Sequence, residues 1–284
     1  MSAADSPSPG RPTVDEQIEE LLDEAEAMLD SAQPDSALAL CSRALRVDPE
    51  HPGALFVQGD CLRATGQLGE ALAAYRAAAL ARPDHADSWA SLALTAYELL
   101  DLKEATRALH RALRQDPRSA QAWWVRAALR EWRGDLAGAD RALCHAAWLD
   151  PVNYPVPPNL SDDEIEEIVE DTLMSLPEGI RSYLSNTAIQ LEELPSRAIL
   201  EQYDPPASPM GMLGYFSGPN LMERGEGFTP WSNLPASIVL FRRNLRRYAT
   251  DRDVLIEELH ITLLHEVGHF LGLDEDDLEA RGLD

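Results

Sequence analysis

The sequence predicts a multidomain protein in which an all-α solenoid of helix-turn-helix repeats is followed by a small α+β domain. Two observations lead to this division. Prolines recur every 34 residues in the N-terminal part of the chain, at Pro49, Pro83, Pro117 and Pro151. Beyond about residue 159 the repeat stops, and short segments with the alternating apolar pattern of strands precede a long helical stretch. A chain of 284 residues is long enough for two such domains.

Aligning the chain on these prolines brings other residues into register. One column contains only alanine, and another contains large apolar side chains. These columns are Ala37, Ala71, Ala105 and Ala139, and Leu21, Leu55, Trp89 and Trp123. Small residues at fixed positions let paired helices approach closely, and large ones fill the space between neighbouring pairs. The pattern resembles the tetratricopeptide-repeat family over residues 17–153, as four helix-turn-helix units.

The resemblance to tetratricopeptide repeats implies a groove that binds a protein or a peptide, lined by the first helix of each repeat. By repeat position, we expect Phe56, Tyr97 and Trp124 to face this groove. The Lys and Asn pairs with which one subtype clamps the carboxylate of a chaperone tail are missing, so that partner is not implied. The alternative is that the array only docks against the second domain of its own chain.

Two short segments flank the repeats. Residues 1–16 are predicted to be a disordered N-terminal tail, because MSAADSPSPGRPT lacks the apolar run of a secretory signal. Residues 154–160 contain three prolines and are predicted to be a linker. The second domain is therefore expected over residues 161–284.

The second domain begins with a predicted amphipathic helix. Ser161 and Glu164 form a capping-box pattern, apolar residues follow at helical spacing, and Pro177 ends the helix. Strands are predicted from β-branched and alternating apolar residues at 186–194, 211–218 and 236–242.

A long helix is predicted near the end of the chain. Thr250 with Asp253 gives it an N-terminal cap, and apolar residues recur at helical spacing up to Gly272. Within this helix the segment HEVGH, residues 265–269, places two histidines four residues apart. This spacing puts both imidazoles on one helix face.

The two histidines and the acid between them form the pattern of a catalytic zinc site. Such a site needs three protein ligands and an open position for water. His265 and His269 supply two ligands, and Glu266 can accept a proton from the water. Gly272 lets the helix stop and the chain turn back, which would bring an acidic side chain from the following residues to the same metal. One zinc ion per chain is therefore predicted.

Four segments of the second domain resemble the minimal zincin-like metallopeptidase family of bacteria, over nearly all of residues 160–284. They are LPEGIRSYLSNTAIQLEE, LGYFSGPNLMERG, SIVLFRRNLRRY and LLHEVGHFLGLDEDDLEARGL. The resemblance implies a compact α+β domain with one zinc ion on His265 and His269, and Glu266 as the general base. The position of the third ligand falls on Glu275, where the family commonly has Asp, and Asp274 is the alternative.

Composition limits the partners. A formal net charge of −25 at pH 7 repels nucleic acid and anionic membranes, and no run of about 18 apolar residues is present to cross a bilayer. We therefore expect neither nucleic acid nor a membrane as a partner. The three cysteines have no CxxC spacing and an odd count, which fits a reducing compartment, so a cytoplasmic location is expected.

Two functions are compatible with these patterns. The leading hypothesis is a zinc-dependent metallopeptidase that hydrolyses peptide bonds with metal-activated water, while the repeats recruit a protein partner or substrate. The alternative is a protein-interaction scaffold whose zinc domain is structural or only weakly active. The intact Glu266 favours the first hypothesis, because a structural site needs no base. The small size of the domain favours the second.

Overall fold

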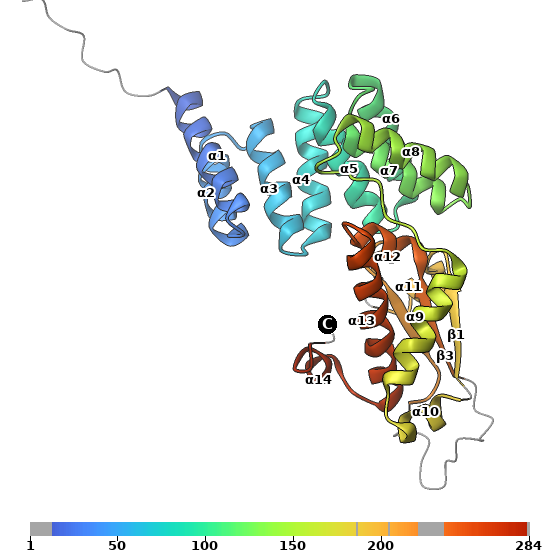
Figure 1. The fold of residues 1–284 in the computed structure, drawn as a ribbon. Helices are drawn as coiled ribbons and strands as arrows, with labels where there is room; N and C mark the ends of the chain where they lie inside the picture. The colour runs from blue at the N-terminus through green and yellow to red at the C-terminus, as the bar shows by residue number, and fades with distance from the viewer. Residues whose placement is uncertain (1–12, 186, 204, 221–235, 283–284) are drawn as a thin grey trace, which may run out of the picture. The chain divides into compact units, whose positions relative to one another are not determined.

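The computed structural model describes residues 13–185, 187–203, 205–220 and 236–282. The chain forms two compact units, and Figure 1 labels most of their elements. The first unit contains the residues up to Arg130 together with Ala137–Leu149, and the second contains Glu131–Leu136 and the chain from Asp150 onward. An all-α repeat unit followed by a small α+β unit is the predicted fold class, which is confirmed. The domain boundaries given by the sequence stay a prediction.

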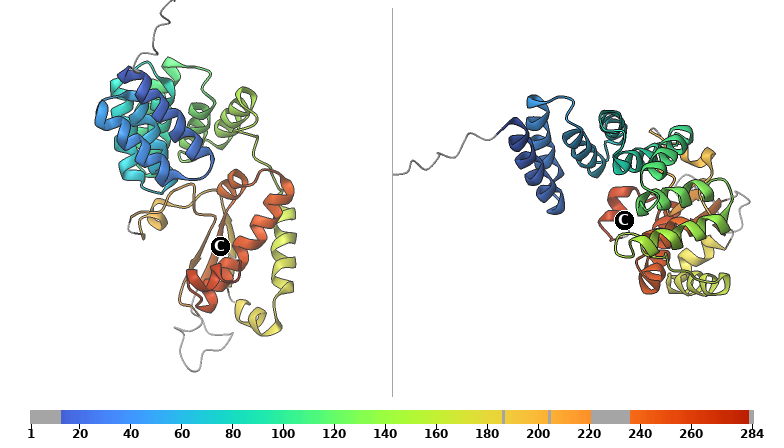
Figure 2. Two further views of the ribbon diagram at one scale, coloured as in Figure 1. Left: turned by 90° about the vertical axis from the view of Figure 1, so that its left-hand side faces the viewer. Right: turned by 90° about the horizontal axis from the view of Figure 1, so that it is seen from above.

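The described residues of the first unit form helices joined by turns, and the last two helices each extend one residue, Glu131 and Leu136, into the second unit. The helices are α1 (Val14–Asp30), α2 (Pro34–Val47), α3 (Pro52–Ala64), α4 (Leu68–Ala81), α5 (Ala86–Glu98), α6 (Leu102–Gln115), α7 (Ala120–Glu131) and α8 (Leu136–Leu149). Helices α1 and α2, α3 and α4, and α5 and α6 pack as pairs, and successive pairs contact each other (Figure 2). The predicted alanine column is fully buried, as expected where paired helices approach closely.

Two of the recurring prolines, Pro83 and Pro117, take part in the same contact in successive repeats. The indole Nε1 of Trp89 donates a hydrogen bond to the carbonyl of Pro83 at 3.0 Å. The indole of Trp123 donates to the carbonyl of Pro117 at 2.9 Å. Each indole therefore ties the turn between two repeats to the first helix of the following repeat, while its ring fills apolar space.

The first helix begins earlier than predicted. Thr13 and Glu16 form a capping box, in which the side chain of each accepts a hydrogen bond from the backbone amide of the other. Helix α1 consequently starts at Val14, inside the segment predicted as a tail. The rest of that segment, residues 1–12, lies outside the described residues.

The second unit combines helices with a three-stranded sheet. Its helices are α9 (Asp162–Ser175), α10 (Glu178–Leu184), α11 (Arg197–Leu200), α12 (Arg242–Tyr248), α13 (Arg252–Leu271) and α14 (Glu275–Glu279). Its strands are β1 (Thr187–Glu192), β2 (Gly214–Ser217) and β3 (Ala236–Phe241), and each lies within a predicted strand. β3 is central: it pairs in parallel with β1 and antiparallel with β2, where Gly214 is opposite Leu240.

One hydrophobic core joins the sheet to the long helix α13. Leu259, Leu263 and Phe270 of α13 belong to the same buried cluster as Ile238 and Leu240 of β3. Helix α9 packs against α13 and adds its apolar face to this cluster (Figures 1 and 2). Because α13 carries the two histidines of the motif, this core determines where they stand relative to the sheet.

The caps of α9 and α13 differ in how well they were predicted. The capping box of Ser161 and Glu164 at the start of α9 is confirmed. The prediction of Thr250 as the cap of α13 is wrong, because Asp251 takes that position. Its carboxylate accepts hydrogen bonds from two backbone amides of the first turn, at 2.9 and 3.0 Å, and faces the positive end of the helix.

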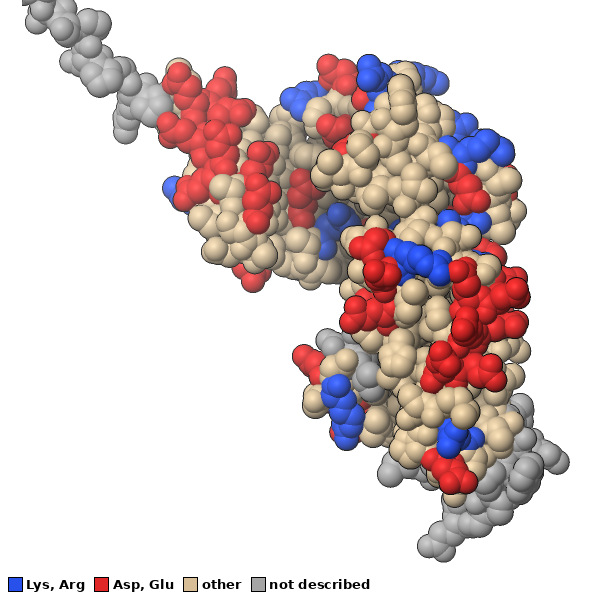
Figure 3. Space-filling model, in the orientation of Figure 1, with Lys and Arg blue, Asp and Glu red and all other residues tan. Residues whose placement is uncertain are grey.

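Acidic side chains gather on two helices, α1 and α9 (Figure 3). Helix α1 carries eight acidic residues and no basic one, and the first turn of α9 contains three consecutive acids. This surface accounts for much of the net charge of −25. In the described part of the chain, no helix combines the length and the apolar character that crossing a membrane requires.

Removing the observed cap of α13 is expected to destabilise that helix. Asp251→Ala deletes the acceptor of two amides, so we expect local stability to fall by about 1 kcal/mol. Thr250→Ala should change it by less than about 0.5 kcal/mol, because Thr250 accepts no bond from the helix. Hydrogen exchange of the α13 amides in the full chain measures both changes. Equal effects of the two substitutions would contradict the assignment of the cap to Asp251.

Candidate metal centre

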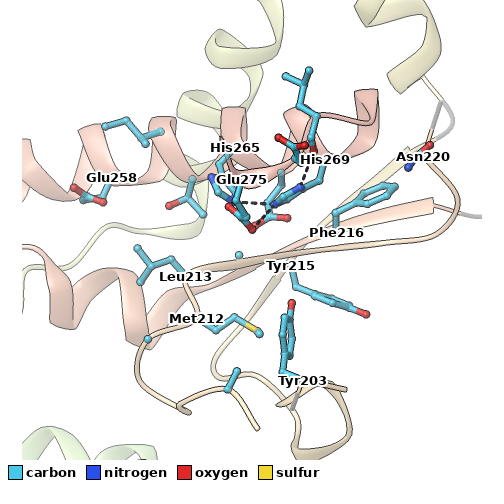
Figure 4. Close-up of a pocket in the computed structure, with 18 of the residues that line it drawn as sticks. Tyr203, Met212, Leu213, Tyr215, Phe216, Asn220, Glu258, His265, His269 and Glu275 are labelled. Carbon is cyan, nitrogen blue, oxygen red and sulfur yellow. Dashed lines mark hydrogen bonds and ion pairs between the residues drawn. The ribbon is translucent and has the colours of Figure 1, made fainter. Parts of the chain in front are cut away.

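Two histidines of α13 face a cavity in the second unit (Figure 4). His265 and His269 lie one helical turn apart, so both imidazoles project from the same face. The helix ends at Gly272, whose φ of 93° is a left-handed conformation that favours glycine. The amide of Leu273 then donates to the carbonyl of Gly268 at 3.0 Å as the chain turns back. The predicted helix end at Gly272 is confirmed.

The turn brings a carboxylate to the two imidazoles. The Nε2 atoms of His265 and His269 are 3.0 Å apart. One carboxylate oxygen of Glu275 lies 3.5 Å from Nε2 of His269, and the other lies 3.8 Å from Nε2 of His265. Figure 4 shows the three side chains converging on one point, and they form a group of potential metal ligands.

Asp274, the alternative third ligand, has a different place in the structure. Its carboxylate accepts a hydrogen bond from the amide of Asp277 at 2.9 Å and caps α14. A capping side chain is directed at the first turn of its own helix. Glu275 is instead directed at the imidazoles, so the geometry favours Glu275 over Asp274 as a ligand.

A close contact between two helices holds α14 beside α13. Leu278 of α14 is fully buried, and it packs on α13 at Gly268. A Cβ atom at position 268 would lie 2.3 Å from Cδ2 of Leu278, far inside the contact distance of two carbon atoms. The glycine inside the histidine motif therefore determines how closely α14, and with it Glu275, approaches α13.

The three side chains fit a zinc ion. Bonds of about 2.0–2.1 Å at tetrahedral angles place neighbouring ligand atoms about 3.3 Å apart. The two Nε2 atoms are 3.0 Å apart, and each lies 3.5 or 3.8 Å from one of the two oxygens of Glu275. One ligand atom from each residue lies within 4.8 Å of the others, so small side-chain adjustments bring the three to tetrahedral separation. The Nδ1 atom of His269 lies 3.3 Å from the carbonyl of Leu273. Because a carbonyl only accepts, the proton belongs on Nδ1, and Nε2 keeps its lone pair for a metal.

Glu266 is buried between α13 and strand β2. Its side chain accepts a hydrogen bond from the amide of Phe216, and only 5% of the residue is exposed. Gly214 makes room for it, since a Cβ atom there would lie 2.7 Å from Oε1 of Glu266. Burial raises the pKa of Glu266 to about 8, opposed by the Phe216 amide and assisted by the charge of Glu275. A divalent cation at the imidazoles favours the ionised carboxylate and opposes this rise.

The candidate centre opens into a cavity of about 910 Å³, a size that suits a ligand of several residues. Aromatic and apolar side chains line it opposite α13, as Figure 4 shows for Tyr203, Met212, Leu213, Tyr215 and Phe216. Helix α13 forms the other side of the cavity. Its lining residues are Glu258, Ile261, Thr262, His265, Glu266 and His269.

The sequence did not predict several residues of this site. At Gly214 and Gly268, side chains from other elements occupy the space that a Cβ atom would need. The sequence does not show which side chains these are, because that depends on how the elements pack. Glu258 is different. It lies seven residues before His265, about two helical turns, so helical spacing alone places it on the histidine face.

The three residues expected to line a groove of the repeat unit differ in exposure. Phe56 and Trp124 are partly exposed, and the Phe56 ring packs edge-on against His85 with centroids 5.5 Å apart. Tyr97 is fully buried, because α5 packs between α4 and α6 and most of its residues are inaccessible. Tyr97 therefore offers no surface to a partner in this structure, contrary to the expectation from its repeat position.

Comparison with known families identifies both units. The family described as zincin-like metallopeptidase matches residues 184–283. The family described as tetratricopeptide repeat matches residues 22–87 and 90–151. The chain is thus a tetratricopeptide-repeat array followed by a zincin-like metallopeptidase domain, as the two resemblances implied.

Similar solved structures include repeat proteins. A thermophilic tetratricopeptide-repeat protein of Thermus thermophilus is 22% identical with a TM-score of 0.43, over 47% of this chain and 75% of that one. MamA of Desulfovibrio magneticus is 18% identical with a TM-score of 0.41, over 56% of this chain and 83% of that one. No curated protein matches the chain.

The choice between the two acids can be tested by metal affinity. Glu275→Ala is expected to weaken zinc binding by at least about tenfold, because it deletes the carboxylate that faces both imidazoles. Asp274→Ala removes only the cap of α14 and should have a smaller effect. Competition with a chromophoric chelator measures both affinities in the full chain. A larger loss in Asp274→Ala than in Glu275→Ala would show that the ligand is Asp274.

The packing of α14 on Gly268 makes a second prediction about the metal. Gly268→Ala forces Leu278 away from α13 and displaces Glu275, so we expect zinc affinity to fall about tenfold although no ligand is changed. Gly179→Ala is the control, because nothing lies within 4 Å of a Cβ atom at that position of α10. Unchanged zinc affinity in Gly268→Ala would mean that α14 does not depend on this contact.

Proposed function

We propose that the second unit is a zinc-dependent metallopeptidase. The observation that carries this proposal is the convergence of His265, His269 and Glu275 on one point near the buried Glu266. A structural zinc site is usually closed by four protein ligands. This group offers three and borders a cavity wide enough for a peptide, which supports a site that leaves a position for water.

We assign roles to the side chains from their positions. Zinc bound here would supply Lewis acidity, which acidifies water and polarises the carbonyl of the scissile bond. Glu266 accepts a proton from the attacking water and passes it to the leaving amine, so that the hydroxyl ends on the carbonyl carbon. The amide of Phe216 and the space at Gly214 hold the Glu266 carboxylate in one position during both transfers.

The repeat unit supports a role in recruiting a protein. Tetratricopeptide repeats are protein-interaction modules, and we propose that this array brings a partner or substrate to the peptidase. Phe56 and Trp124 are the groove residues that retain exposed surface, so they carry this part of the proposal. Acidic surfaces on α1 and α9 support the expectation of a protein rather than nucleic acid, and the proposed location is the cytoplasm.

Glu266→Gln separates catalysis from metal binding. The amide is nearly isosteric with the carboxyl and can still accept from Phe216, so we expect the fold and the zinc content to be retained. It cannot accept the proton, and hydrolysis should fall by about 10² to 10⁴. The measurement is cleavage of a proteome-derived peptide library by full-length, zinc-loaded protein, together with metal analysis of each preparation.

Two results would count against this function. Equal cleavage by wild type and Glu266→Gln would show that another group, or a contaminating enzyme, is responsible. A wild type that holds one zinc ion per chain and cleaves no peptide would favour the alternative, in which the domain is structural and the protein acts as an interaction scaffold.

A further inference from the structure

A carboxylate outside the candidate metal centre lines the same cavity. Glu258 lies on α13 seven residues before His265, on the same face of the helix. At 1.5 Å of rise per residue, about 10 Å of helix separates the two positions. Figure 4 shows Glu258 and Leu213 toward one end of the cavity and Asn220 toward the other, with the two histidines between them.

Glu258 is a carboxylate without a partner among the described residues. It is half-buried, and within the described residues it forms no hydrogen bond or ion pair. Burial raises the pKa of its carboxyl, and the neighbouring Glu257 adds to the rise. A cation beside Glu258 would stabilise the ionised carboxylate and offset the loss of hydration that burial causes.

The surroundings of Glu258 suit a long side chain that ends in a positive charge. Ile261, one turn along α13 from Glu258, and Leu213 give the cavity apolar lining, and Figure 4 shows Leu213 toward the same end of the cavity as Glu258. None of the described residues that line the cavity is arginine or lysine. Arginine and lysine combine an aliphatic stem with a cationic head, so they match both the apolar walls and the acid beyond them.

On the basis of the proposed peptidase function, we propose that Glu258 selects substrates with an arginine or lysine side chain next to the scissile bond. The stem of that side chain lies along Leu213 and Ile261, and its head pairs with the Glu258 carboxylate. One or two residues of extended chain, each advancing about 3.4 Å, together with a long side chain span the distance from His265. The selected residue therefore lies within two positions of the cleaved bond.

The experiment compares arginine with citrulline, which has nearly the same shape but no charge. Matched peptides carry arginine or citrulline at each position around the bonds that the wild type cleaves. If the wild type cleaves no bond, the two residues are placed at each position of a random peptide library. Hydrolysis is measured for zinc-loaded, full-length wild type, Glu258→Gln and Glu257→Gln. Glu257 is the matched control, because it is an exposed acid of the same helix that does not line the cavity. Equilibrium binding of the same peptides is measured in each variant combined with Glu266→Gln, which should hold substrate without cleaving it.

We expect wild type and Glu257→Gln to prefer arginine over citrulline about fivefold at one position near the scissile bond, in both hydrolysis and binding. Glu258→Gln should lose this preference. Hydrolysis without that preference, or a preference that survives in Glu258→Gln, would overturn the role of Glu258 and leave the peptidase function standing. A preference seen in binding without hydrolysis in any variant would uphold the selection and overturn the peptidase function. Absence of both would overturn both.

Discussion

Leu278 packs against α13 where that helix has no side chain, at Gly268, and the candidate metal centre depends on this contact. The histidines come from one helix and need only helical geometry to stand together. The third side chain comes from another helix, beyond a glycine with φ of 93°. Neither the turn nor the five-residue α14 has a large core of its own. The approach of Leu278 is what places Glu275 within 4 Å of both imidazoles.

A second close approach joins the same helix to the sheet. Gly214, in edge strand β2, leaves the space that Glu266 occupies. The amide of Phe216, two residues further along that strand, donates a hydrogen bond to the Glu266 carboxylate. Glu266, the proposed base, is therefore held by the strand that borders the cavity, and glycines position both Glu266 and the candidate ligands. This arrangement shields Glu266 from water, which raises its pKa, while the imidazoles of His265 and His269 remain partly exposed. A proton acceptor and a water-accessible site thus lie within one turn of α13.

The parts of this fold that follow from local spacing were predictable from the sequence. The repeat length, the three strands, the end of α13 at Gly272 and the pairing of His265 with His269 all rest on periodicity or on the preference of one residue type. What could not be predicted depends on contacts between separate elements. Leu278 at Gly268 and Glu266 at Gly214 are such contacts. The cap of α13 is a local error instead: the sequence predicted Thr250, and the amides of the first turn bond to Asp251. Tyr97 has the right repeat position for a groove, yet its burial depends on how neighbouring helices pack.

X-ray absorption at the zinc edge of the full-length, zinc-loaded protein tests the central claim most directly, because it reports the ligands without requiring a substrate. Two imidazole nitrogens and oxygen ligands from Glu275 and water, all at about 2.0–2.2 Å, are the expected first shell. Replacement of Glu275 by alanine should remove one carboxylate oxygen and leave both imidazoles. A shell containing sulfur at about 2.3 Å, or one with fewer than two imidazoles, would contradict the account.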